Sequence, residues 1–310
     1  MIRPLATLAL ALAVLLLRTD AARADEALDL VAVSLEADRL SEASFTAMLA
    51  REQRMIEISN RLRRAGVDIC GEEVAPILGL QVLRALELPW AYVNPAIRLF
   101  GVGVDESIAW IAPGSAAERA GLAPRDVIRS VDGSAITSEV DLNDRRAAPG
   151  ASSLRFGIER AGARRTLEVP YDPGCSVQPM LGLSSENNAL STEHHVIVFS
   201  ETMRDAGSDD EIAAVVGHEL GHVVLGHRKA RAASEAEADY FALYLLARAG
   251  FDPEAAAEAW RRRARTMPES LIGWGTHPSA PERALAAEHA LAEIAAKRAA
   301  GKPLVPEDNQ

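Results

Sequence analysis

The spacing of apolar residues divides the chain into two helix-rich parts with a strand-rich part between them. Over residues 25–65 apolar side chains recur every three or four positions and no proline interrupts them, so helices are expected there. From about residue 96 short β-like runs alternate with turns, and these runs are residues 102–104, 108–111, 127–131 and 154–159. After a further β-like segment at residues 195–199, helical periodicity continues to about residue 300. The pattern predicts an α+β protein.

The changes in pattern also predict the domain boundaries. We expect a helical part over residues 25–95, a strand-rich domain over 96–172, a mainly helical domain with a small β-sheet over 173–300 and a flexible tail over 301–310. Residues 1–24 follow none of these patterns and require a separate interpretation.

The N-terminal residues have the pattern of a secretory signal peptide. Arg3 precedes an apolar run over residues 5–17, and Ala22-Arg23-Ala24 has the form that signal peptidase cuts. An uncleaved membrane anchor is the alternative, but a run of this length spans about 20 Å as a helix, less than the roughly 30 Å of a bilayer core. We expect cleavage near Ala24 and a periplasmic or secreted protein.

The net charge and the number of cysteines limit the possible partners and suggest a disulfide. The formal net charge of −11 argues against a nucleic-acid partner. Cys70 and Cys175 are the only cysteines, and an even number in an exported chain favours a disulfide, with two buried free thiols as the alternative. Because these cysteines flank the strand-rich domain, a bridge would indicate that this domain is inserted into the chain of the other.

Arginines gather at residues 260–265, on a helix that Asp252 and Pro253 are expected to begin. A run of this kind is usually a solvated helix face. The alternative is peripheral contact with anionic lipid headgroups at a membrane.

Residues 108–136 carry a recognisable arrangement of turns. Ser115 can cap a short helix, Gly121 suits a left-handed C-cap, and Asp132-Gly133 suits a tight hairpin. This stretch resembles the PDZ domains of bacterial proteases. The resemblance implies a groove for extended peptides beside a helix expected near residues 139–146. The glycine-rich loop at residues 100–103 suggests capture of peptide C-termini, and a spacer or dimer contact is the alternative.

The segment His-Glu-Leu-Gly-His over residues 218–222 carries the candidate chemistry. Ser208 and Glu211 form a capping-box pattern, and the helix they begin is expected to run to about Leu225. His218 and His222 then lie one above the other and can bind one ion, while Glu219 lies about 100° round the helix as a candidate general base. This pattern predicts a zinc site that needs a third protein ligand.

The acidic stretch at residues 234–240, on a helix expected to end near Gly250, is the best source of that ligand. The metzincin pattern would require His at 228, where the chain has Arg228, so His227 is out of phase for that kind of site. We expect His227 to lie near the helix C-terminus, where an imidazole is favoured.

Together with the His-Glu-Leu-Gly-His segment, two motifs later in the chain indicate a resemblance to a known family. Glu235 and Asp239 form an ExxxD pattern, and His277-Pro278 and Arg283 follow. The chain resembles the HExxH/ExxxD gluzincin metallopeptidases that include the CaaX prenyl proteases and the HtpX-like and BepA-like peptidases. The resemblance also covers residues 188–199, where it implies an edge strand that pairs with an extended substrate.

The resemblance implies one zinc ion per chain and a role for each matching residue. Glu235 would be the third ligand and Asp239 would support a ligand histidine, whereas Glu237 points about 200° away from Glu235. His277 and Arg283 would stabilise the oxyanion of the tetrahedral intermediate. The alternatives are that His277 only packs before Ser279 at a helix start, and that Arg283 forms a salt bridge to an acidic group behind the ligands.

The expected function is therefore that of an exported zinc metalloendopeptidase. Its substrates would be extended or misfolded polypeptides in envelope protein quality control. The second hypothesis is a non-catalytic, PDZ-based peptide-binding chaperone or scaffold with a silent zinc site. A serine protease is excluded because no Gly-x-Ser-x-Gly turn occurs.

Overall fold

The computed structural model describes residues 30–71, 74–136, 151–227, 231–273 and 277–307, and the predicted signal peptide lies outside them. The chain forms two compact units, residues 1–44 and residues 45–310. The contacts, pockets and sites described below all lie within the second. Among the described residues, no helix is both long enough and apolar enough to span a membrane.

Helix α2 (Leu30–Ala65) confirms the helix expected from the apolar spacing over these residues and is one continuous element, whereas β1 (Val74–Ile77) and β2 (Leu80–Leu83) follow within the part expected to be helical. It ends before Gly66, where a Cβ atom would lie 2.8 Å from the side chain of Leu245 and 2.9 Å from the sulfur of Cys175. Met55 and Leu62 of α2 are buried in the same apolar core as residues of α7 and α8. The second half of α2 therefore belongs to the core of the C-terminal domain.

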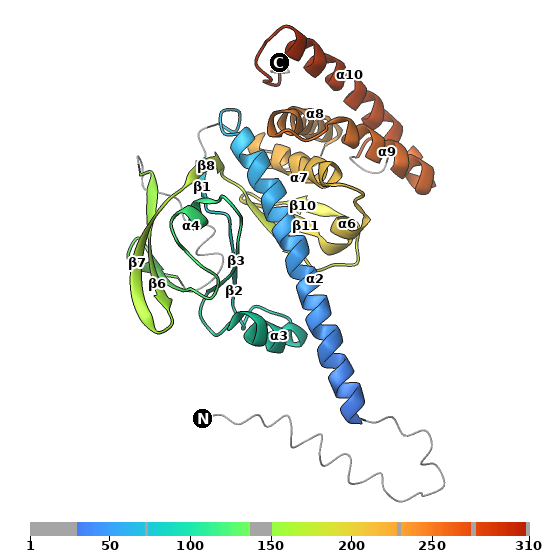
Figure 1. The fold of residues 1–310 in the computed structure, drawn as a ribbon. Helices are drawn as coiled ribbons and strands as arrows, with labels where there is room; N and C mark the ends of the chain where they lie inside the picture. The colour runs from blue at the N-terminus through green and yellow to red at the C-terminus, as the bar shows by residue number, and fades with distance from the viewer. Residues whose placement is uncertain (1–29, 72–73, 137–150, 228–230, 274–276, 308–310) are drawn as a thin grey trace, which may run out of the picture. The chain divides into compact units, whose positions relative to one another are not determined.

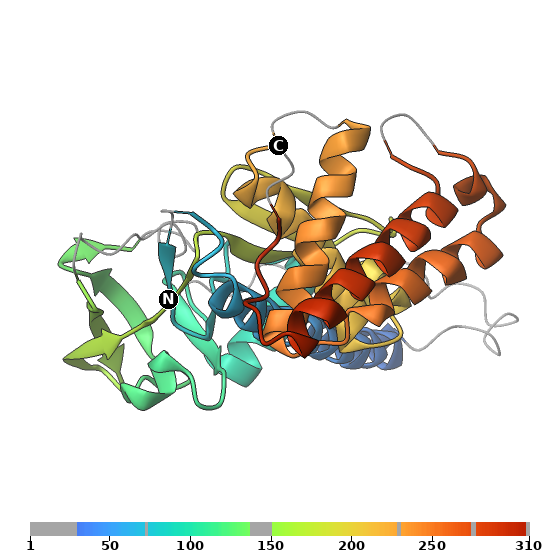
Figure 2. The same cartoon turned by 90° about the horizontal axis from the view of Figure 1, so that it is seen from above.

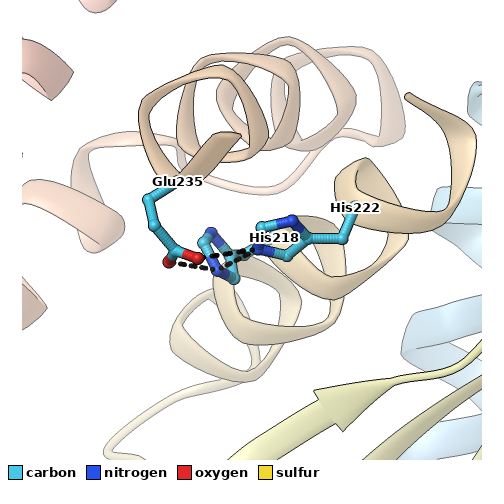
Figure 3. A group of neighbouring side chains, drawn as sticks. All are labelled: His218, His222 and Glu235. Atoms are coloured by element: carbon cyan, nitrogen blue, oxygen red, sulfur yellow. Dashed lines mark hydrogen bonds and ion pairs between the residues drawn. The ribbon is translucent and has the colours of Figure 1, made fainter. Parts of the chain in front are cut away.

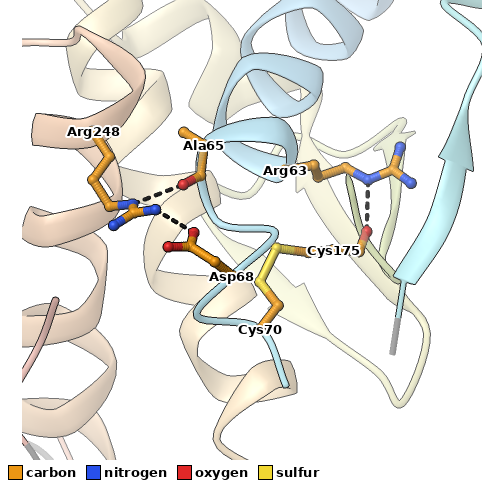
Figure 4. The surroundings of a disulfide bond; sticks show 6 residues. All are labelled: Arg63, Ala65, Asp68, Cys70, Cys175 and Arg248. Atoms are coloured by element: carbon orange, nitrogen blue, oxygen red, sulfur yellow. Dashed lines mark hydrogen bonds and ion pairs between the residues drawn. A yellow bond between two sulfur atoms is a disulfide. The ribbon is translucent and has the colours of Figure 1, made fainter. Parts of the chain in front are cut away.

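A disulfide joins Cys70 to Cys175, with 5.6 Å between their Cα atoms. Strand β1 (Val74–Ile77) pairs antiparallel with β8 (Asp172–Cys175) beside it. The buried guanidinium of Arg63 donates to the carbonyl of Cys175 over 2.9 Å (Figure 4). The two ends of the intervening domain thus lie next to each other, which is the arrangement expected of an inserted domain.

The inserted domain is built on a six-stranded sheet with the order β2-β3-β4-β6-β7, to which β5 is added on β4 (Figure 1). Its strands are β2 (Leu80–Leu83), β3 (Ser107–Ile111), β4 (Val127–Val131), β5 (Ser134–Ala135), β6 (Ser153–Arg160) and β7 (Ala163–Pro170). It also carries α3 (Trp90–Phe100) and α4 (Ala116–Arg119). Because β2 pairs with β3, the sheet begins before the boundary expected at residue 96.

The turns of this domain match the sequence prediction. The Ser115 side chain accepts from the backbone N–H of Glu118 at the start of α4, and Gly121 and Gly133 both have positive φ. In the residue 100–103 segment, Gly101 ends α3 as a left-handed C-cap. The turn that leads into β2 contains Gly79, which also has a positive φ of 72°. The helix expected near residues 139–146 lies outside the described residues.

The C-terminal domain combines a three-stranded sheet with helices. The sheet has the order β10-β11-β9 and α7 packs against it (Figure 1). The elements are β9 (Gln178–Gly182), β10 (Ala189–Ser191), β11 (His195–Phe199), α6 (Ser200–Asp205), α7 (Asp209–Val224), α8 (Ala232–Ala249), α9 (Glu254–Thr266), the 3-10 helix η1 (Pro268–Leu271) and α10 (Ala280–Ala299). Helices α9 and α10 run side by side (Figure 2). Together with the inserted sheet, these elements confirm the α+β class.

Two sequence expectations change in this domain. Within the predicted edge segment, β11 is the middle strand, and β10 is the edge strand. The tail expected to be flexible is held as far as residue 307, because Arg248 donates to the carbonyl of Leu304 and Lys297 to that of Val305, each over 2.9 Å. Leu304 also packs on the α8–α10 core.

Glu52 of α2 is a titrating group that lies against the inserted domain, where it accepts from the Gln81 amide. Burial raises the pKa of Glu52 from its ordinary value of 4.5 to about 7, although the Gln81 hydrogen bond lowers it. Between these pH values the folded state binds more protons than the unfolded state, so this carboxyl makes the free energy of unfolding fall as pH rises.

Replacing Glu52 by glutamine should remove that pH dependence. We expect Glu52→Gln to exceed the wild type in stability by roughly 1–3 kcal/mol at about pH 8 and to match it near pH 4. Urea unfolding at both pH values measures the difference. A variant that is less stable than the wild type at about pH 8 would contradict the interpretation.

Candidate metal centre

Helix α7 begins and ends as its sequence predicts. The Ser208 side chain accepts from the backbone N–H of Glu211, and Gly226 beyond the helix has φ 66°. The Glu211 carboxylate departs from a complete capping box, because it accepts from the backbone N–H of Gly207 over 2.8 Å and pairs with Arg262. This capped helix carries His218, Glu219 and His222.

Two glycines on α7 allow α8 to approach closely, and sequence reasoning did not identify them. A Cβ atom at Gly221 would lie 3.1 Å from the backbone of Ala238, and one at Gly217 would lie 3.3 Å from the Ala242 side chain. Their spacing of four residues is the only signal in the sequence. This close approach brings Glu235 of α8 to the histidines of α7.

The side chains of His218, His222 and Glu235 converge on one point (Figure 3). The two Nε2 atoms are 3.1 Å apart, Glu235 Oε1 is 3.4 Å from His222 Nε2, and Glu235 Oε2 is 3.5 Å from His218 Nε2. In a tetrahedral zinc site with bonds of about 2.0–2.1 Å, ligand atoms lie about 3.3 Å apart. Both the spacing and the two-nitrogen, one-oxygen donor set fit zinc with one position left open.

His218 is held from behind by a chain of side chains. Its Nδ1 atom is 2.8 Å from Asp239 Oδ1, and Arg283 makes hydrogen bonds of 2.5 and 2.6 Å to the two Asp239 oxygens. The Arg283 guanidinium lies 3.6 Å from the ring centroid of Trp260. Arg283 is thus buried and engaged, which favours the salt-bridge alternative over an oxyanion role. The sequence pattern places Trp260 only in the arginine-rich helix and gives no sign of this contact.

Glu219 and His277 differ in their surroundings. Glu219 is 9% exposed, and burial raises its pKa although the charge of His218 lowers it. The His277 side chain is 57% exposed, and its Nδ1 atom lies 2.9 Å from Glu235 Oε2. His277 therefore contacts a candidate metal ligand directly. Glu219 is not one of the three converging ligands and remains a candidate base.

The protein environment sets contrasting charges on the candidate ligands. Burial lowers the pKa of His218, but hydrogen bonds to Asp239 and Glu235 outweigh it and raise the pKa to about 9. Burial and the nearby charge of His218 lower the pKa of His222 to about 4. Burial raises the pKa of Glu235, but the hydrogen bond to His218 outweighs it and gives a pKa of about 2. The carboxylate is thus ionised, as a zinc ligand must be.

The pKa of Asp239 is lowered by the same kinds of interaction as that of Glu235. Burial raises its pKa, but the hydrogen bond to His218 and the charge of Arg283 outweigh it, and its pKa falls to about 2. An ionised Asp239 can accept a hydrogen bond from the Nδ1–H of His218, which holds the ring so that Nε2 can bind a metal.

Glu237 and His227 both face away from the point where the three candidate ligands meet. Glu237 Oε2 lies 2.9 Å from His227 Nε2, which agrees with its predicted direction away from Glu235. His227 Nδ1 lies 3.0 Å from His222 Nδ1, a contact that sequence reasoning did not foresee. His227 therefore touches the candidate centre without joining it.

The three candidate ligands lie in the wall of a pocket of about 950 Å³. Elements α6 to α10 and β10 contribute to this wall, which includes Leu190, Val215, Trp260 and Met267. Because the edge strand β10 borders the pocket, an extended chain can add to it as a further strand.

Known protein families match the inserted domain and the C-terminal domain separately. Residues 169–234 and 228–291 match the family model of Peptidase family M48, and residues 107–160 match that of the PDZ domain. The mitochondrial metalloendopeptidase OMA1 of Arabidopsis thaliana is 28% identical over 129 residues, which cover 28% of this chain and 26% of that protein. The chain thus spans about a quarter of the length of this curated relative.

Solved structures that cover about a third of this chain are also similar to it. The HtrA3 PDZ domain bound to a phage-derived ligand is 17% identical, with a TM-score of 0.25, and covers 33% of this chain and 88% of its own. The HtrA-type protease AlgW with a decapeptide is 24% identical, with a TM-score of 0.26, and covers 33% of this chain and 29% of its own.

Proposed function

We propose that this protein is a zinc-dependent metalloendopeptidase. The observation that carries the proposal is the convergence of His218, His222 and Glu235 at zinc-ligand spacing in the wall of a large pocket. Glu219 lines the same pocket and follows His218 directly on α7. The match to Peptidase family M48 over the same residues supports this proposal.

Each residue has a task in the hydrolysis of a peptide bond. A bound zinc ion would act as a Lewis acid toward the scissile carbonyl and toward water. Glu219 accepts a proton from the attacking water and passes it to the leaving amine. Asp239, itself fixed by Arg283, holds the His218 ring with Nε2 toward the centre. Strand β10 aligns the substrate backbone by antiparallel pairing.

The proposal extends to substrate and location. An edge strand beside the cleft favours extended or misfolded polypeptides, and the PDZ domain is proposed to bind peptides, including C-termini. The signal-peptide pattern at residues 5–24 and the Cys70–Cys175 disulfide support an exported protein that acts in envelope quality control.

Removing the metal is the direct test. We expect the purified protein to contain one zinc ion per chain and to cleave an unfolded protein. A chelator should abolish cleavage, and added zinc should restore it. His222→Ala should lose both zinc and activity because two ligands no longer enclose the ion. Zinc measured by atomic absorption without any cleavage would instead favour the peptide-binding scaffold.

A further inference from the structure

The two histidines of the centre are supported differently. Each presents Nε2 to the common point, so each has an Nδ1 atom facing away from it. The Nδ1 atom of His218 meets the carboxylate of Asp239, whereas the Nδ1 atom of His222 meets another imidazole, that of His227, at 3.0 Å. The His227 ring is only 10% exposed, and its Nε2 atom lies 2.9 Å from Glu237 Oε2.

The direction of each hydrogen bond in this chain follows from proton counting. If Nε2 of His222 binds a metal ion, its proton must be on Nδ1, which then donates. His227 Nδ1 must accept, so the His227 proton is on Nε2 and is donated to Glu237. One tautomer of each ring satisfies every contact, and the negative charge of Glu237 favours that tautomer.

The same contacts connect the two helices that supply the ligands. His227 follows the end of α7, and Glu237 lies on α8 two residues after Glu235. The Glu237 side chain is 47% exposed, so its hydrogen bond with the neutral His227 ring is screened by solvent and contributes little to folding stability. An effect of removing this pair is therefore expected in ligand orientation rather than in the free energy of unfolding.

We propose that His227 is a positioning residue that accepts a hydrogen bond from His222 and thereby fixes its ring for the metal, with Glu237 holding His227 in the accepting tautomer. The inference rests on the proposed metal centre. Partners of metal-bound histidines of this kind commonly contribute about 10–100-fold to metal affinity.

The experiment measures zinc affinity by chelator competition in four variants of the full chain. His227→Leu removes the acceptor and keeps the bulk, and we expect its zinc dissociation constant to rise about 10–100-fold. His227→Asn places an amide oxygen near the former Nδ1 position and should stay within about threefold of the wild type. Glu237→Gln should fall between these two. His289→Leu makes the same chemical change at an exposed position of α10 and should bind zinc as the wild type does.

A spectroscopic measurement separates this role from simple packing. In the zinc-loaded, ¹⁵N-labelled protein, the Nδ1–H signal of His222 should be protected from exchange in the wild type and in His227→Asn, and lost in His227→Leu. Equal zinc affinity in His227→Leu and the wild type would overturn the inference, as would equal loss in the Asn and Leu variants. Failure of the wild type to bind zinc would overturn the proposed function as well.

Discussion

Glu219→Gln is expected to slow polypeptide cleavage by about 10²–10⁴-fold while leaving zinc binding intact. The glutamine amide has nearly the same shape as the carboxylate but cannot accept the proton of the attacking water. Glu219 is not among the three converging ligands, so its replacement removes no metal bond. Turnover and zinc content should therefore respond independently.

The measurement compares initial rates of cleavage of an unfolded protein with zinc content per chain. Glu57→Gln, a matched change at an exposed position of α2, serves as the control and should cleave at the wild-type rate. Wild-type activity in Glu219→Gln would rule out this residue as the base. Loss of zinc in the same variant would instead assign Glu219 a structural part in the centre.

Removing the disulfide is expected to have a large effect on the free energy of unfolding. Replacing Cys70 and Cys175 together by serine should lower the free energy of unfolding by about 4–5 kcal/mol, because the bridge closes a loop of 105 residues in the unfolded chain. The bonded cysteines are buried beside Gly66, so two serine hydroxyls would also lie in an apolar core.

Urea unfolding of the double variant and of the wild type, with and without reductant, measures this loss. These two cysteines are the only ones in the chain, so reduction of the wild type acts on this bridge alone. We expect the reduced wild type and the double variant to unfold at similar urea concentrations. A double variant as stable as the oxidised wild type would show that the bridge contributes little.

Local features of this protein could be predicted because their causes lie within a few residues. Ser208 caps α7 and Ser115 caps α4 as their neighbours require, and Gly250 ends α8 in the left-handed conformation. The spacing of His218 and His222 places two nitrogens on one helix face, as the structure shows. The roles of Glu235 and Asp239 were predicted from the resemblance to a family and not from local physical rules. In the structure both side chains lie beside the histidines.

Features that depend on distant contacts could not be predicted. Trp260 stacks on Arg283 only because the fold brings α9 and α10 together. No local rule distinguishes Trp260 from a residue of a solvated arginine-rich helix. The close approach at Gly221 depends on Ala238 of the next helix, so its glycine could not be interpreted from α7 alone.

The disulfide also determines how the molecule responds to mechanical force. When the chain is pulled from its two ends, tension passes from Cys70 to Cys175 through the sulfur atoms and bypasses the residues between them. The sequence separation of 105 residues corresponds to about 350 Å of extended chain. The inserted sheet therefore carries no load while the bridge is intact, and a reductant is needed before stretching can unravel it.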